Sequence, residues 1–157
     1  DDMLTVKYTS DGEFQWARSY SSNQNGPDWG YSIAADDSNN IYSSGYGYID
    51  GNNEIVTIKY NTNGDEMWIR KNTTLGGDYL RPVKSATDKY NNIIVNGYYY
   101  LGEQYAFITI KYNSDGDTLW KRIYKRRRQS EFLFCTVHRQ FGKCLCCRQE
   151  YKHRNRE

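Results

Sequence analysis

Short runs of β-branched and aromatic residues alternate with polar clusters along residues 1–124. Such alternation is typical of β-strands, and no stretch has the apolar spacing and capping residues that a helix needs. The clusters between the runs contain Asn, Asp, Ser and Gly, which predict tight turns. Strands are expected at about Glu54–Tyr60, Trp68–Lys71, Tyr79–Ala86 and Asn92–Tyr99. Along the first of these, Ile55, Thr57 and Lys59 lie on one face, and Val56, Ile58 and Tyr60 on the other.

The same arrangement of residues returns every 52 positions. The tetrapeptide Thr5–Tyr8 returns as Thr57–Tyr60 and as Thr109–Tyr112. Four strands of about 5–6 residues with their turns account for about 50 residues, which is close to the length of one β-propeller blade. A strand-and-loop solenoid would not need so long a unit. The other recurring positions are Gly12, Gly64 and Gly116; Trp16, Trp68 and Trp120; and Asp36, Asn40 and Gly45 with Asp88, Asn92 and Gly97.

The tryptophan that recurs in each unit has two interpretations. A large apolar ring in every copy favours a core residue packed between neighbouring units. The alternative is an exposed platform on which a ligand stacks. We expect core packing for Trp16, Trp68 and Trp120.

These motifs together resemble a known repeat. Each unit has Thr-Val/Ile-Lys-Tyr, a glycine four residues later, a tryptophan four residues after that, and then Asp, Asn and Gly. This pattern resembles the SBBP-type β-propeller repeat of secreted or surface-exposed bacterial proteins. The resemblance covers residues 1–124. It implies an extracellular, seven-bladed propeller with no catalytic residues to transfer to this chain.

Seven units of this length would need about 360 residues, whereas the 157 residues present provide at most three. We therefore expect an all-β fragment of about two to three four-stranded blades. Isolated blades leave sheet edges that a closed propeller covers. The remaining blades of the same polypeptide are thus the first expected partner.

Composition divides the chain near Tyr124. Residues 1–124 carry 11 Lys and Arg against 16 Asp and Glu, a net charge of −5, while residues 125–157 carry 10 against 3, a net charge of +7. All four cysteines and both histidines lie after Tyr124, whereas all four tryptophans and 15 of the 16 tyrosines lie in residues 1–124. We expect tandem blade repeats over 1–124 and a basic, cysteine-containing tail over 125–157 that is disordered or misfolded.

The tail has the features of a continuation of the repeat in another reading frame. Codons permitted for His138–Gln149, shifted by one nucleotide, can encode Ile-Asp-Asn-Leu-Gly-Asn-Val-Tyr-Val-Ala-Gly. In that peptide, the Asp, Asn and Gly have the mutual spacing of Asp36, Asn40 and Gly45. The hypothesis is a frameshift near Lys125–Arg128. The nucleotide sequence tests it, and an in-frame tail with unrelated codons would refute it.

Two motifs in the tail suggest other functions. Cys144, Cys146 and Cys147, with His138 and His153, could be drawn as a zinc site, but they lack the paired cysteine spacing of structural zinc modules. Lys125–Arg128 resembles a nucleic-acid-binding or nuclear-localisation patch. The acidic first 124 residues would repel a phosphate backbone. We therefore expect neither a metal site nor a nucleic-acid partner.

Two turns echo the opening of a calcium loop. They are Asn61–Asp65 and Asn113–Asp117, but Arg70 and Arg122 stand where an EF-hand loop has its liganding glutamate. A hairpin turn accounts for these residues without calcium. Calcium binding stays the alternative.

No residues in the repeats form a familiar catalytic group. Asp36, Asp37 and Asp88 could act as paired acid and base, but aspartates before Asn-rich turns more often bind their own backbone. Residues 1–124 contain no histidine, no nucleophile elbow and no phosphate loop. We therefore predict no catalytic, cofactor-binding or metal-binding residues, and no cofactor.

The favoured function is a noncatalytic module that presents loops to an unidentified protein or glycan. Tyrosine suits such a contact surface because it gives rigid amphipathic area at small entropic cost. Five tyrosines are candidate contact residues, and about half of them are expected to pack in the core instead. The alternative is a fragment of a propeller enzyme, such as a hydrolase or lyase, with its catalytic residues outside this chain. No run approaches the ~20 apolar residues of a membrane helix, so no membrane span is expected. The candidate contact residues are Tyr46, Tyr48, Tyr98, Tyr99 and Tyr100.

Overall fold

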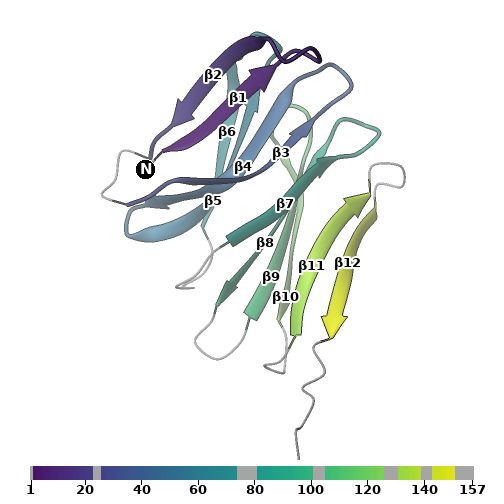
Figure 1. Ribbon diagram of the computed structural model, residues 1–157. Coiled ribbons are helices and arrows are strands. Elements are labelled where there is room, and N and C mark those ends of the chain that lie inside the picture. Colours follow the sequence, from purple (N-terminus) through teal and green to yellow (C-terminus); the bar gives the residue numbers. More distant parts are fainter. Residues whose placement is uncertain are drawn as a thin grey trace, which may run out of the picture.

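The computed structural model describes residues 2–22, 26–73, 81–100, 105–125, 131–138 and 143–150. These residues form twelve β-strands and no helix (Figure 1). The expectation of an all-β chain is confirmed. For β7, β11 and β12, residues 81–83, 131–138 and 143–150 are described by their backbone alone.

The strands form four antiparallel sheets in sequence order. Two sheets have four strands and two have two strands, and within each sheet every strand pairs with its neighbour along the chain. The two-stranded sheets are β1 (Met3–Tyr8) with β2 (Phe14–Tyr20), and β11 (Glu131–His138) with β12 (Lys143–Glu150). The first four-stranded sheet contains β3 (Trp29–Ala35), β4 (Ile41–Ile49), β5 (Asn52–Tyr60) and β6 (Glu66–Thr73). The second contains β7 (Arg81–Thr87), β8 (Ile93–Tyr100), β9 (Tyr105–Tyr112) and β10 (Thr118–Lys125).

The sheets stack in the order of the sequence. β1 contacts β3, β3 lies beside β7, and β7 lies beside β11 (Figure 1). β7 begins 52 residues after β3, and β11 begins 50 residues after β7. Strands therefore recur in the tail although its sequence no longer carries the repeat motif. The frameshift remains a hypothesis for the nucleotide sequence to test.

Buried side chains gather between successive sheets, so both faces of the central strand β5 are covered. Val56 and Ile58 face the first sheet and Ile55 faces the β7–β10 sheet. All three side chains are fully buried. The first cluster contains Met3, Trp16, Tyr20, Val56, Ile58 and Tyr60. The second contains Tyr42, Ile55, Trp68, Ile93, Val95, Tyr99, Ala106, Ile108, Ile110 and Tyr112.

The turns that join β5 to β6 and β9 to β10 have the same construction. The Asn61 side-chain oxygen accepts hydrogen bonds from the backbone N–H groups of Asn63 and Asp65, both at 2.9 Å. Gly64 then adopts a φ of 82°, a conformation that glycine reaches without steric cost. Asn113 and Gly116 repeat this arrangement one unit later. The predicted hairpin turns are confirmed.

Candidate functional site

Each of the first two sheets binds a turn of the next sheet with three side chains, a contact that we call gripping the turn. The Trp16 indole N–H donates to the Thr62 carbonyl oxygen at 3.0 Å, and the Lys7 ammonium donates to the same oxygen at 3.1 Å. The Arg18 Nε–H donates to the Gly64 carbonyl oxygen at 2.7 Å. We call this set of Lys, Trp and Arg side chains the clamp. It joins β1 and β2 to the turn between β5 and β6.

The second clamp repeats the first with the same atoms. The Trp68 indole N–H donates to the Ser114 carbonyl oxygen at 3.0 Å, and the Lys59 ammonium donates to that oxygen at 2.9 Å. The Arg70 Nε–H donates to the Gly116 carbonyl oxygen at 2.6 Å. In both clamps, the tryptophan and the arginine reach residues that lie 46 positions later in the sequence. The contact between sheets therefore repeats with the sequence.

Aromatic packing orients the clamp arginine. The Arg18 guanidinium lies 5.8 Å from the centre of the Trp16 ring, and Arg70 lies 5.4 Å from the Trp68 ring. A guanidinium over an indole is attracted by the ring and loses less freedom when it donates a hydrogen bond. Trp16 and Trp68 are buried, as expected from the sequence.

The glycine of the gripped turn leaves room for the clamp. A Cβ atom at Gly64 would lie 2.8 Å from Cδ2 of Trp16, and one at Gly116 would lie 2.9 Å from Cδ2 of Trp68. Real Cβ atoms do not approach so closely. The recurring glycine thus serves both the turn and the contact with the preceding sheet.

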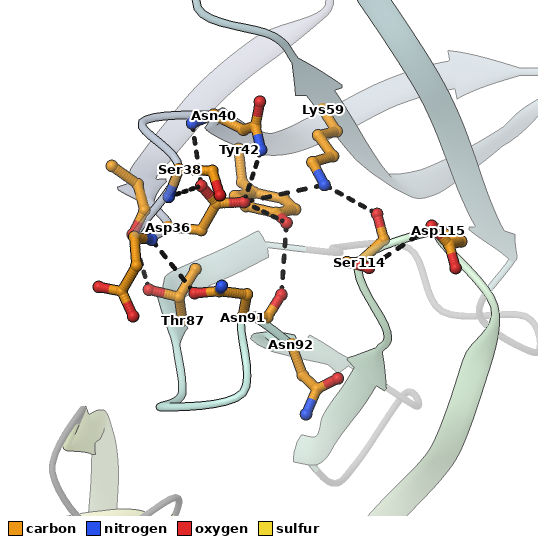
Figure 2. A network of polar contacts seen from close by, with 12 residues as sticks. Asp36, Ser38, Asn40, Tyr42, Lys59, Thr87, Asn91, Asn92, Ser114 and Asp115 are labelled. Carbon is orange, nitrogen blue, oxygen red and sulfur yellow. Dashed lines mark hydrogen bonds and ion pairs between the residues drawn. The ribbon is translucent and has the colours of Figure 1, made fainter.

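A buried carboxylate, Asp36, lies at the boundary between the two four-stranded sheets (Figure 2). Asp36 accepts hydrogen bonds from the backbone N–H groups of Ser38 and Asn40, both at 2.9 Å, and from the Tyr42 hydroxyl at 3.1 Å. The Lys59 ammonium lies 3.8 Å from the same carboxylate. Each of these donors lies in the β3–β6 sheet, so the carboxylate stabilises the turn before β4.

The neighbouring sheet contributes the remaining contacts at this boundary. The Asn91 side-chain oxygen accepts from the backbone N–H of Asp37 at 3.1 Å, and the Thr87 hydroxyl donates to the Ala35 carbonyl oxygen at 2.7 Å. The Tyr42 hydroxyl also lies 3.4 Å from the Asn91 carbonyl oxygen. Figure 2 shows the Tyr42 hydroxyl between the Asp36 carboxylate and the Asn91 backbone at this boundary.

Hydrogen bonding keeps both buried aspartates ionised. Burial raises the pKa of Asp36, but hydrogen bonds from Asn40, Tyr42 and Ser38 outweigh it, so its pKa lies below the ordinary value of 3.8. Burial also raises the pKa of Asp88, and the bond from Lys111 is the largest of those that bring it below 3.8. The two aspartates bind their own turns, as expected. Their oxygens accept hydrogen bonds from these donors.

The asparagines and aspartates of the calcium-like turns are used by the turns themselves. The Asn61 amide donates to the Asp65 carboxylate at 2.8 Å, and the Asn113 amide donates to Asp117 at 3.1 Å. Each bond uses one of the two oxygens of the carboxylate. Within the described ranges, no three His, Cys, Asp or Glu side chains cluster in a way that could hold a metal ion.

The tyrosines expected to contact a partner occupy different environments. Tyr99 is 2% exposed and belongs to the core, so the prediction is wrong for this residue. Tyr46 and Tyr48 are half-buried, and the Tyr46 ring lies 5.8 Å from that of Tyr31. Tyr98 and Tyr100 are also half-buried, and both rings pack against Tyr105, at 5.9 and 5.1 Å.

The candidate residues of the tail lie where the side chains are not described. Cys144, Cys146 and Cys147 are on β12 and His138 is on β11, whereas His153 lies outside the described residues. The basic run Lys125–Arg128 begins at the last residue of β10, and its other three residues also lie outside. The zinc and nucleic-acid interpretations therefore stay untested.

The clamp arginine is the functional residue that the sequence reasoning missed. Arg18, Arg70 and Arg122 follow the recurring tryptophan by two residues in every copy, so the signal was present. Only its partner, a carbonyl oxygen in the next sheet, could not be read from the motif.

Comparison of the sequence with protein-family models and with curated proteins finds no match. In the described part of the chain, no helix has the length and apolar character to cross a membrane. A functional proposal therefore depends on the geometry of the sheets and clamps.

Proposed function

We propose that this chain is a noncatalytic scaffold and binding module, built from SBBP-type β-propeller blades within a larger secreted or cell-surface protein. The observation that carries the proposal is the repeated clamp. The same Trp and Arg donors grip the same turn carbonyls in two successive sheets, always 46 residues ahead. A radial array of blades requires the same contact between each unit and the next.

The arrangement of strands supports the same proposal. Each four-stranded sheet is an antiparallel meander, and its first strand lies beside the first strand of the next sheet, as β3 lies beside β7. A propeller places the first strand of each blade around its central channel. β3, β7 and β11 would occupy those positions here.

Exposed aromatic side chains on β3 offer a surface for a partner. Trp29, Tyr31 and Ile33 are 47%, 39% and 56% exposed. A register shift between Gly30 and Ser32 places Trp29 and Ile33 on opposite faces of the sheet, so the aromatic surface is formed by Trp29 and Tyr31 at the start of β3. Aromatic rings on a rigid strand bind both protein side chains and the apolar faces of sugars with little loss of freedom. We propose that a protein or glycan partner binds at Trp29 and Tyr31, beside the Tyr46 ring with which Tyr31 packs.

Imaging the extended polypeptide tests the architecture. Electron microscopy of a protein that contains all the 52-residue units should show closed rings of blades. An open rod of stacked sheets would contradict the propeller while leaving the clamp intact.

A binding screen tests the module's role. A glycan and peptide array should show a ligand whose binding is lost in Trp29→Ala. Tyr90→Ala, which removes a 70% exposed ring from a turn outside β3, is the matched control. Equal loss in both variants would exclude Trp29 and Tyr31 as the binding surface.

A further inference from the structure

The β7–β10 sheet carries a third clamp whose donors have no turn to grip. Trp120 and Arg122 lie on β10, and Lys111 lies directly opposite Trp120 on β9. Among the described residues, the Trp120 indole N–H has no acceptor, and the Arg122 side chain donates only to the carbonyl oxygen of Lys121. Trp120 is half-buried, whereas its counterparts Trp16 and Trp68 are buried.

The lysine of this third clamp has a different partner from the other two. Lys111 forms a 2.7 Å ion pair with Asp88, and no turn carbonyl accepts from it among the described residues. In the occupied clamp, Lys59 donates to Ser114 at 2.9 Å and lies farther from its own aspartate. The third clamp thus has the composition of the other two without their acceptor.

Aromatic residues cover the same face of the β7–β10 sheet. Tyr98 pairs across the strands with Phe107, and Tyr100 pairs with Tyr105. These side chains are partly exposed, and Tyr124 on β10 is 64% exposed. One repeat earlier, Ile55 occupies the position of Phe107 and is fully buried against the next sheet. An aromatic face of this kind is usually covered by a partner.

The first sheet exposes the surface that fits this face. Leu4 and Tyr8 on β1 are 63% and 58% exposed, whereas their counterparts Val56 and Tyr60 are 0% and 3% exposed because the preceding sheet covers them. The turn that follows β1, Ser10–Gly12, stands 52 residues before Thr62–Gly64, which the first clamp grips. No described donor binds its carbonyl oxygens, and a Cβ atom at Gly12 would meet nothing within 4 Å.

We propose that the Ser10–Gly12 turn of a second copy of this chain occupies the third clamp, so that copies associate head to tail. Trp120 donates to the Ser10 carbonyl oxygen and Arg122 donates to that of Gly12, as their counterparts do in the occupied clamps. Docking also brings Leu4 and Tyr8 of the second copy against the aromatic face. The acidic residues Asp11 and Glu13 of the turn complement the clamp cations in charge.

Such an interface is heterologous, because the two surfaces differ. Heterologous contacts produce rings or filaments according to the rotation between copies. Docking would also place β1 of the second copy beside the outer edge of β12. This is the position that β5 takes beside β4 in the complete β3–β6 sheet. The inference concerns the 157-residue chain by itself. In a longer array, neighbouring units of the same polypeptide would supply the turn and the clamp in place of the second copy.

Sedimentation of the 157-residue chain over a range of concentrations tests the inference. The unmodified chain should associate reversibly, and both Gly12→Ala and Arg122→Ala should weaken association by about tenfold or more, through a clash and a lost charge-assisted hydrogen bond. Gly51→Ala is the control for the first variant, since Gly51 also has a positive φ and open space around its Cβ position. Lys121→Ala is the control for the second, because Lys121 lies on the opposite face of β10.

Mixing the two weakened variants distinguishes this contact from any other. Gly12→Ala retains an intact clamp and Arg122→Ala retains an intact turn, so an equimolar mixture should form a one-to-one complex that neither variant forms alone. A chain that stays monomeric at all concentrations would overturn the inference. Association that survives in both variants, or a mixture without complementation, would also overturn it.

Discussion

Lys111 forms a 2.7 Å ion pair with Asp88, whereas Lys59, its counterpart one repeat earlier, lies 3.8 Å from Asp36. The difference follows from the neighbours of each lysine. Lys59 also donates to the Ser114 carbonyl oxygen in the next sheet, and this bond holds its ammonium between two acceptors. Lys111 has no such carbonyl acceptor among the described residues, so its ammonium approaches the Asp88 carboxylate of its own sheet more closely.

The Asp88 ion pair predicts a specific acid sensitivity. Because the folded-state pKa of Asp88 lies below 3.8, its ionised form stabilises the fold above that pH, and the contribution is lost as the pH falls through the lowered pKa. Asp88→Asn should cost about 3 kcal/mol at pH 7 and much less near pH 2. Urea unfolding at both values, at a concentration where the chain is monomeric, measures this change, with exposed Asp11→Asn as the control. An equal cost at the two pH values would contradict the assignment.

The clamp tryptophans should differ in their contributions to stability. Trp68→Phe removes the N–H that binds Ser114 and part of a buried ring, so we expect a loss of about 2 kcal/mol in the free energy of unfolding. Trp120→Phe removes the same atoms at a clamp with no described acceptor, and it should cost about 0.5 kcal/mol. Guanidinium unfolding at a concentration where the chain is monomeric measures both. Similar losses would show that the indole N–H of Trp68 contributes little.

The turn glycines should tolerate alanine unequally. Gly51→Ala and Gly64→Ala share the cost of a positive φ, about 1–2 kcal/mol. Gly64→Ala also drives a Cβ atom into the Trp16 ring, which adds about 1–3 kcal/mol. Thermal unfolding of the two variants gives the difference. If their midpoints agree, the clamp does not depend on the close approach of the turn.

Tyr20 should determine part of the alkaline stability. Burial, with a further contribution from the charge of Asp28, raises the pKa of Tyr20 to about 12. Its neutral phenol therefore favours the fold below pH 10, and this contribution is lost as the pH rises toward 12. The free energy of unfolding of Tyr20→Phe should therefore fall less steeply with pH between 10 and 12 than that of the unmodified chain, which urea unfolding at several pH values measures.

The neutral-pH stability of Tyr20→Phe provides a second check. The Tyr20 hydroxyl is buried without a hydrogen-bond partner among the described residues, so its removal should be neutral or stabilising by up to about 1 kcal/mol. Tyr124→Phe, which alters an exposed ring, is the control. A marked loss at pH 7 would mean that the Tyr20 hydroxyl has a partner, such as an ordered water.

Local sequence signals predicted the strands and turns closely. The strand expected at Glu54–Tyr60 runs over Asn52–Tyr60, and the one expected at Asn92–Tyr99 runs over Ile93–Tyr100. These predictions succeed because alternation and Asn-Gly turn chemistry act over a few residues. The same reasoning failed for Tyr99, since exposure depends on which sheet lies above the strand.

By itself, the sequence determined the 52-residue period, the all-β class and the position of the turn glycines, since each depends on side chains close together along the chain. Tertiary structure alone decided that Trp16 and Arg18 bind carbonyl oxygens 46 residues away and that Lys59 is buried. Those outcomes arise from stacking one sheet on another, and the pattern within a strand does not specify which surface will cover it.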